Sequence, residues 1–330
     1  MSTPPAPLPA PLYQGSVNTW ECDDGGHLNI RFHLERAYIG LAHMAHALEI
    51  PRAFTSAAAS TLTPLELHVR FNKEALPGAP LVMHGGVIEI GETDARFCLD
   101  MRHADGASSS SFAIKVAHTD TRDFRAFAWS PRTREAASRL RVELPAHAKP
   151  RSVDVTKTPS DASRDRALEC GALRIGGAMV LGEHCDTFGR MRFDHLMGRV
   201  SDSVPNLLAQ WRADAAADKG AAPAGAVVEA RYIYRQWPRP GDLIEVYSGI
   251  IEVGEKTLRL VHWLCDPASG KLWMSMEVTA LTFDTATRKT ISPSPEVRAR
   301  MKSAWSRSRS NLERRRPRPH ARAAYCTKAS

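Results

Sequence analysis

The sequence predicts an α+β protein built from two tandem copies of one unit, in which a curved antiparallel sheet wraps a long central helix. Three observations indicate this fold class. The chain repeats itself at a fixed offset, each copy holds one long apolar helical stretch, and strand-like runs follow that stretch in both copies. A helix that is apolar around much of its circumference must be buried, and one curved sheet per copy can bury it.

The repeat is visible when the sequence is shifted by 163 residues. More than a dozen identities then align without a gap, whereas average composition gives roughly one chance identity in 16 positions. Cys22 and Asp23 align with Cys185 and Asp186, and the segment 88–92 aligns with 251–255. We interpret this as a tandem duplication.

In the first copy, a short strand-like run at 12–20 precedes a helix predicted from about Leu28 to Ile50, where Pro51 ends it. Residues 64–71 then alternate strictly between apolar and polar side chains, which is typical of a strand with one solvated face. Three more strand-like runs follow, and the last two are joined by a hairpin at 105–106.

The second copy repeats this plan. A strand-like run at 171–181 precedes a helical stretch at 193–211, and strand-like runs follow from Val228 onward. Pro205 lies inside the helical stretch, so a kink or a break is expected there.

These patterns divide the chain into five parts. A Pro-rich lead (1–11) precedes the first domain (12–125), a linker with a short helix (126–166), the second domain (167–295) and a basic tail (296–330). The tail holds eleven Lys or Arg and two Glu, and its removal leaves 33 basic and 34 acidic residues. The net charge of +8 therefore resides in the tail, which is expected to be a solvated extension, although non-specific nucleic-acid binding is an alternative.

Several classes of protein are disfavoured by what the sequence lacks. It has no run of 18 apolar residues, so no membrane-spanning helix is expected. The six cysteines form no C-x-x-C pair, which favours free thiols in a reducing compartment, and a cytoplasmic location is expected. Without a Walker loop, a dinucleotide fingerprint, an H-E-x-x-H motif or an EF-hand spacing, neither a nucleotide cofactor nor a metal is expected.

The segment "ECDDGGHLN", residues 21–29, carries the candidate chemistry. It combines acidic side chains, a glycine pair and the start of a helix. An acid can attack a carbonyl or activate water, and the first N–H groups of a helix can stabilise a developing negative charge. The same residues would also serve as helix caps and turn formers, and both interpretations are open at this point.

With its Asp before a Gly-His-Leu-Asn step into a long helix, the chain resembles the hotdog fold. More narrowly, it is similar to a tandem, double-hotdog relative of the 4-hydroxybenzoyl-CoA thioesterase-like acyl-CoA thioesterases. The resemblance covers about residues 12–125 and 168–290. It implies hydrolysis of an acyl-CoA to a free acid and CoA, with sites at the interface of the two hotdogs and with no cofactor beyond the CoA of the substrate. Two double-hotdog units could pair again as a homodimer.

The resemblance also implies roles for particular residues. The catalytic Asp of the family maps onto Asp23 and, through the repeat, onto Asp186. Backbone N–H groups near Gly26 to Asn29, together with those of the other copy, are expected to polarise the thioester carbonyl. The substrate-binding positions implied are Gly26, His27 and Asn29 in the first copy and Gly189 in the second. The second copy departs from the motif, because Arg190 and Arg192 stand where His27 and Asn29 stand in the first.

Two other functions are open on the sequence. Hotdog enoyl-CoA hydratases also use an Asp and a His, but five residues apart, whereas Asp23 and His27 are four apart. A non-catalytic acyl-CoA or acyl-carrier binding module would fit the altered second copy. Cys22 and Cys185 have no evident base as a partner, so we expect them to be small buried residues.

Overall fold

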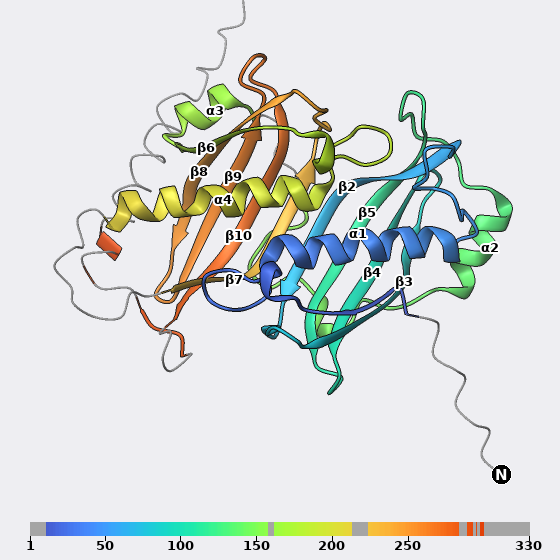
Figure 1. Cartoon of the computed structure of the whole chain (residues 1–330), viewed down its shortest axis with the longest axis horizontal. Helices are drawn as coiled ribbons and strands as arrows, with labels where there is room; N and C mark the ends of the chain where they lie inside the picture. Colours follow the sequence, from blue (N-terminus) through green and yellow to red (C-terminus); the bar gives the residue numbers. More distant parts are fainter. Residues whose placement is uncertain are drawn as a thin grey trace, which may run out of the picture.

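The two copies form one continuous antiparallel sheet of ten strands, with the order β1-β3-β4-β5-β2-β7-β10-β9-β8-β6 (Figure 1). The computed structural model describes residues 11–157, 162–212, 224–283, 289–292, 295 and 298–299. The strands of the first copy are β1 (Tyr13–Ser16), β2 (Ser60–Phe71), β3 (Pro80–Ile90), β4 (Asp94–His103) and β5 (Ser108–Asp120). Those of the second are β6 (Leu173–Met179), β7 (Ala224–Tyr234), β8 (Leu243–Val253), β9 (Thr257–Cys265) and β10 (Leu272–Phe283).

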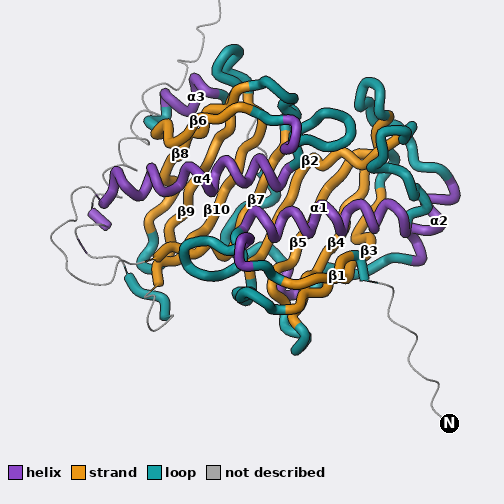
Figure 2. The backbone as a smooth tube through the Cα atoms, viewed as in Figure 1, coloured by secondary structure: helices purple, strands orange, loops and turns teal. Residues whose placement is uncertain are grey.

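Two long helices lie across one face of this sheet, one over each copy (Figure 2). They are α1 (Ile30–Ala47) and α4 (Phe193–Arg212), and the shorter helices are α2 (Pro131–Arg139) and α3 (Arg164–Glu169). Short 3-10 turns precede both long helices, at Thr19–Glu21 and Gly182–His184, and a third lies at Ala146–Ala148. Within the described part of the chain, no helix is long and apolar enough to cross a membrane.

Helix α1 forms where the apolar pattern predicts it and is shorter by two or three residues at each end. Asn29 caps its first turn by accepting a hydrogen bond from the Arg31 amide at 2.9 Å, and Leu48 follows its last turn. The side chains that face the sheet are fully buried, among them Leu34, Leu41 and Met44. The wide apolar surface of the helix therefore predicted its burial correctly.

Helix α4 continues through Pro205 to Arg212, so the break expected there does not occur. Its first turns lie beside those of α1 and run in the opposite direction. The Tyr38 and Phe193 rings are 5.5 Å apart at one end of this contact, and Arg31 approaches Gly198 at the other. The two copies are thus joined by the helix pair as well as by the sheet.

The seam of the sheet is the pairing of β2 with β7, where Leu67 lies opposite Tyr232 and His68 opposite Arg231. The polar side chains of this seam form two diagonal ion pairs. Glu66 accepts from Arg231 Nε at 3.0 Å, and Glu229 lies 2.8 Å from His68 Nε2. The offset of 163 residues relates Glu66 to Glu229 and His68 to Arg231. The two pairs therefore occupy equivalent positions about the pseudo-two-fold axis between the copies.

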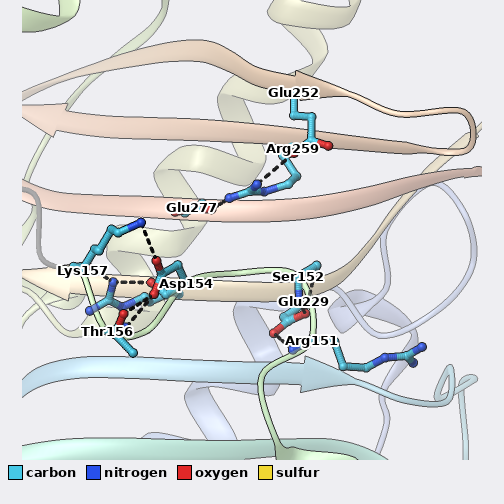
Figure 3. Close-up of polar contacts among 10 residues, drawn as sticks. Arg151, Ser152, Asp154, Thr156, Lys157, Glu229, Glu252, Arg259 and Glu277 are labelled. Atoms are coloured by element: carbon cyan, nitrogen blue, oxygen red, sulfur yellow. Dashed lines mark hydrogen bonds and ion pairs between the residues drawn. The ribbon is translucent and has the colours of Figure 1, made fainter.

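The linker between the copies crosses the face of the sheet opposite to the long helices (Figure 3). We call residues 140–157 the strap. The Arg151 and Ser152 amides donate to the Glu229 carboxylate at 2.9 and 2.8 Å, and Arg231 donates to the carbonyls of Asp154 and Lys157. The sequence predicted a polar linker with a short helix. The helix is α2, and the strap is held by the charged side chains of the seam.

Candidate active site

Residues 21–29 form a tight turn that places Asp23 at the start of α1. The Asp23 amide donates to the His27 carbonyl and the Gly26 amide to the Asp23 carbonyl, both at 3.0 Å. Cys22 and Leu28 form an isolated antiparallel bridge that closes the turn. The structure therefore brings together Asp23, Gly26, His27 and Asn29, all of which the sequence singled out.

The Asp23 carboxylate lies within a chain of three ionisable side chains. Its Oδ2 is 3.2 Å from His27 Nδ1, and His27 Nε2 is 3.7 Å from Glu74 Oε1. The exposed fraction of the side chain is 27% for Asp23, 17% for His27 and 45% for Glu74. The carboxylate is thus accessible from solvent, while the imidazole beside it is more enclosed.

The pKa of Asp23 is lowered from its ordinary value. Partial burial acts in the opposite direction and would raise this pKa. The hydrogen bond and the charge of His27, together with the amides of Gly25 and His27, outweigh burial. Gly25 N–H donates to Asp23 Oδ1 at 2.9 Å. The carboxylate is therefore ionised at neutral pH, as a nucleophile or a general base must be.

Asn29 is the N-cap of α1, as the capping interpretation predicted. Its side chain accepts from the Arg31 amide, and its carbonyl accepts from the Phe32 amide at 2.9 Å. Ser201 of α4 donates to the same Asn29 Oδ1 at 3.4 Å. The side-chain oxygen of Asn29 thus caps α1 and also links the turn to the second copy.

Three of the amide groups between Gly26 and Asn29 donate to backbone carbonyls inside the protein. The Gly26 amide donates to Asp23, the Leu28 amide to the Ala75 carbonyl at 2.8 Å, and the Asn29 amide to the Glu21 carbonyl at 2.9 Å. The turn needs these bonds to hold its shape.

Gly26 and its counterpart Gly189 have a backbone reason to be glycine. Their φ angles are +76° and +71°, in the region that side chains with a Cβ rarely adopt. We expect Gly26→Ala to lower the free energy of unfolding by about 1 kcal/mol through strain alone, because no atom lies within 4 Å of the added Cβ.

Denaturant unfolding of Gly26→Ala beside Gly182→Ala measures this cost. Gly182 has equally open space around an added Cβ and lacks a positive φ. Equal stability of the two variants would contradict the strain.

The two cysteines before the acids are only partly buried, and not fully buried as expected. Cys22 Sγ lies 3.5 Å from the Asn18 carbonyl, and Cys185 Sγ lies 3.5 Å from the Leu181 carbonyl. Burial, followed by the charge of the neighbouring Asp, raises the pKa of both thiols. A thiol with a raised pKa is protonated at neutral pH and is a poor nucleophile.

In the second copy, the equivalent turn has the same backbone and a different set of side chains. The Asp186 amide donates to the Arg190 carbonyl at 2.7 Å, and Cys185 bridges to Met191. Asp186 forms an ion pair with Arg190, and Gly189 occupies the position of Gly26. The predicted residues of the second copy, Asp186 and Gly189, therefore lie together in one turn.

Glu74 is the residue of the site that the sequence analysis did not identify. It lies beyond the end of β2, 51 residues after Asp23, and no local spacing connects the two. One signal was present, since the offset of 163 residues aligns Glu74 with Trp237. The first copy has His27 and Glu74 near Asp23, and the second copy has Arg190 and Trp237 at the aligned positions. Both neighbours of the acid are therefore changed in the second copy.

Comparisons with known proteins agree with this architecture. The family model of the thioesterase-like superfamily matches twice, at residues 17–148 and 180–301. No curated protein matches the chain.

Two solved structures have the same overall fold. The 12:0-ACP thioesterase from Umbellularia californica has a TM-score of 0.62 at 12% identity, covering 82% of this chain and 93% of its own. An acyl-ACP thioesterase from Bacteroides thetaiotaomicron has a TM-score of 0.57 at 12% identity, covering 81% and 96%. At such identities the likeness establishes the fold alone. The family match extends over both copies and most of the chain, which therefore belongs to the thioesterase-like superfamily.

Proposed function

We propose that the protein hydrolyses an acyl-CoA thioester, with Asp23 as the reacting acid. The observation that carries this proposal is the Asp23 carboxylate, ionised and accessible, beside His27 at the N-terminus of α1. Membership in the thioesterase-like superfamily supports the reaction class. Because the chemistry uses a carboxylate and water, it needs no group beyond the CoA of the substrate.

The reaction begins at the thioester carbonyl carbon. Asp23 either attacks this carbon directly, giving an anhydride that water then cleaves, or takes a proton from a water that attacks it. The carbon–sulfur bond breaks in both routes, and the CoA sulfur leaves as a thiolate that accepts a proton. The products are the free acid and CoA.

We assign the stabilisation of the oxyanion to the Ile30 amide. Ile30 is the first residue of α1, and the first N–H groups of a helix have no carbonyl partner within the helix. The adjacent Arg31 amide is held by the Asn29 cap. A carbonyl oxygen at Ile30 would also lie at the positive end of the helix dipole.

His27 and Glu74 act on Asp23 through the imidazole. Nδ1 of His27 faces the Asp23 carboxylate, and Nε2 faces Glu74. A neutral imidazole donates from only one ring nitrogen, so donation to both acids requires the charged form of His27, which Glu74 favours. This arrangement orients Asp23 and stabilises the ionised carboxylate.

We expect Glu74→Gln to lower kcat/KM about tenfold and leave folding intact, because Glu74 is half-exposed and acts only through His27. The rate of thiol release from an acyl-CoA measures the effect. Glu89→Gln is the matched control, since Glu89 is 63% exposed and pairs with Arg96 at 3.4 Å. Wild-type kinetics in Glu74→Gln would remove Glu74 from the site.

The experiment that tests the proposed function is a panel of acyl-CoA and acyl-carrier-protein thioesters, with free thiol as the readout. Thiol release from acyl-CoA supports the proposal, and release only from the carrier-bound thioesters would change the substrate class. An enoyl-CoA that loses its enoyl absorbance without releasing thiol would indicate a hydratase. Binding of acyl-CoA without turnover would indicate a binding module.

A further inference from the structure

The carboxylate of Asp186 differs from that of Asp23 in the number of its hydrogen-bond donors. Its Oδ1 accepts from the amides of Phe188 and Arg190, both at 2.9 Å. Its Oδ2 accepts from Arg190 Nε and lies 3.0 Å from both Nε and Nη2 of that guanidinium. The side chains of Asp186 and Arg190 are 7% and 5% exposed. Both oxygens of this acid are therefore engaged by donors and shielded from solvent.

Aromatic rings surround the guanidinium that neutralises Asp186. The Arg190 Cζ atom is 4.1 Å from the ring centre of Phe124, 5.4 Å from that of Phe188 and 5.8 Å from that of Trp237. These distances allow cation–π attraction to all three rings. Phe124 has a φ of +56°, which is rare for a bulky residue, so its backbone is strained in the conformation that covers Arg190.

Three contacts of this turn cross from the second copy to the first. Arg190 Nη1 donates to Thr63 Oγ1 in β2 at 2.9 Å. Thr187 donates to the Phe54 carbonyl at 3.0 Å, in the segment after α1. Phe124 belongs to the segment after β5. The turn at 185–192 therefore attaches to three separate segments of the first copy.

We propose that this turn is a closed clamp between the two copies and that the chain has one active site, at Asp23. We use the name Arg190 clamp for the ion pair and the residues around it, which are Thr63, Phe124, Asp186, Phe188, Arg190 and Trp237. An acid whose oxygens accept three hydrogen bonds and are paired with a buried guanidinium is a weak nucleophile. The same turn that positions a reacting acid in the first copy positions an ion pair in the second. The count of one active site rests on the proposed function, whereas the clamp does not.

Carboxyl footprinting of the wild-type protein tests the clamp without any variant. A carbodiimide with glycine ethyl ester labels accessible carboxylates, and mass spectrometry locates each label. We expect Asp23 and the exposed Asp24 to be labelled at least several-fold faster than Asp186. Labelling of Asp186 as fast as Asp23 would overturn the clamp.

A double-mutant cycle tests the ion pair at its centre. Asp186→Asn and Arg190→Met should each lower the thermal midpoint by several degrees, and the double variant should be no less stable than the worse single one. The control cycle uses Lys73→Met and Asp105→Asn, a pair 2.6 Å apart whose side chains are 51% and 58% exposed, where little loss is expected. Additive losses at Asp186 and Arg190 would contradict a coupled pair.

The number of sites is read from calorimetric titration with a non-hydrolysable acyl-CoA thioether. One molecule bound per chain is expected, and two would overturn the inference of a single site. No binding would refute the proposed function, and the footprinting would still decide whether the clamp is closed.

Discussion

Asp23→Asn is expected to abolish most of the thioester hydrolysis while the protein remains folded. The amide has the size of the carboxylate and can still accept the Gly25 N–H bond to its oxygen. It cannot attack a carbonyl or take a proton from water, so kcat should fall by roughly 10²–10⁴-fold. Thiol release at saturating acyl-CoA measures the loss, and the thermal midpoint verifies folding.

The neighbouring Asp24 provides the control for this variant. Its side chain is exposed on the same turn, so Asp24→Asn changes the same charge at a distance of one residue. We expect Asp24→Asn to retain the rate of the wild type within about twofold, as surface substitutions usually do. A folded Asp23→Asn protein with wild-type turnover would remove Asp23 from the chemistry.

The parts of the fold that could be predicted are those set by local pattern. The apolar periodicity of residues 30–48 predicted α1, and strict alternation at 64–71 predicted the second part of β2. The solvated face expected for that strand was wrong, because His68 and Arg70 on its polar face are buried. Of the kink or break expected at Pro205, the break does not occur, because α4 continues through this residue. In α4, the packing of the whole helix outweighs the low helix propensity of one proline.

The candidate site was predictable only where its residues are neighbours in the sequence. Asp23, Gly26, His27 and Asn29 belong to one turn, so the sequence placed them together. Glu74 comes to this turn from another element, through the bond between the Leu28 amide and the Ala75 carbonyl. Such a contact depends on the tertiary arrangement, and no spacing in the sequence reports it.

In the second copy, too, the sequence could not predict contacts between residues that are far apart in the chain. The sequence revealed that Arg190 stands in the place of His27 and did not show what its guanidinium contacts. Only the structure shows that the guanidinium faces Asp186 and that Phe124, from the first copy, covers it. The repeat thus marked the position of the change, and the packing between copies explains it.

The contacts at the seam between β2 and β7 give a structural role to the identical residues Glu66 and Glu229. Both acids lie on the outer face of the central strands, and each pairs with a basic residue of the opposite copy. Of these two acids, Glu229 also accepts hydrogen bonds from the strap, from the amides of Arg151 and Ser152. The two identical acids therefore each contribute to a contact between the duplicated halves.

Glu229→Gln is accordingly expected to lower the free energy of unfolding by about 3–5 kcal/mol, as the removal of one partner from a buried ion pair does. The side chain of Glu229 is 1% exposed and contacts His68. It also accepts hydrogen bonds from the two strap amides and from the Ser152 hydroxyl. Denaturant unfolding measures the loss. Glu252→Gln is the control, because Glu252 is 58% exposed beside Arg259 and should cost less than about 1 kcal/mol.

The pH dependence distinguishes the charge of Glu229 from its shape. Burial would raise the pKa of this carboxyl, but the bonds from His68, Ser152 and Arg151 outweigh burial and lower the pKa from 4.5 to about 2. A carboxyl with a lowered pKa contributes its stability fully above pH 4.5, and that stability is lost as the pH falls toward about 2. The stability gap between wild type and Glu229→Gln should therefore narrow across this range. A gap that stays constant from pH 5 to pH 2 would show that the amide disrupts packing and that the charge contributes little.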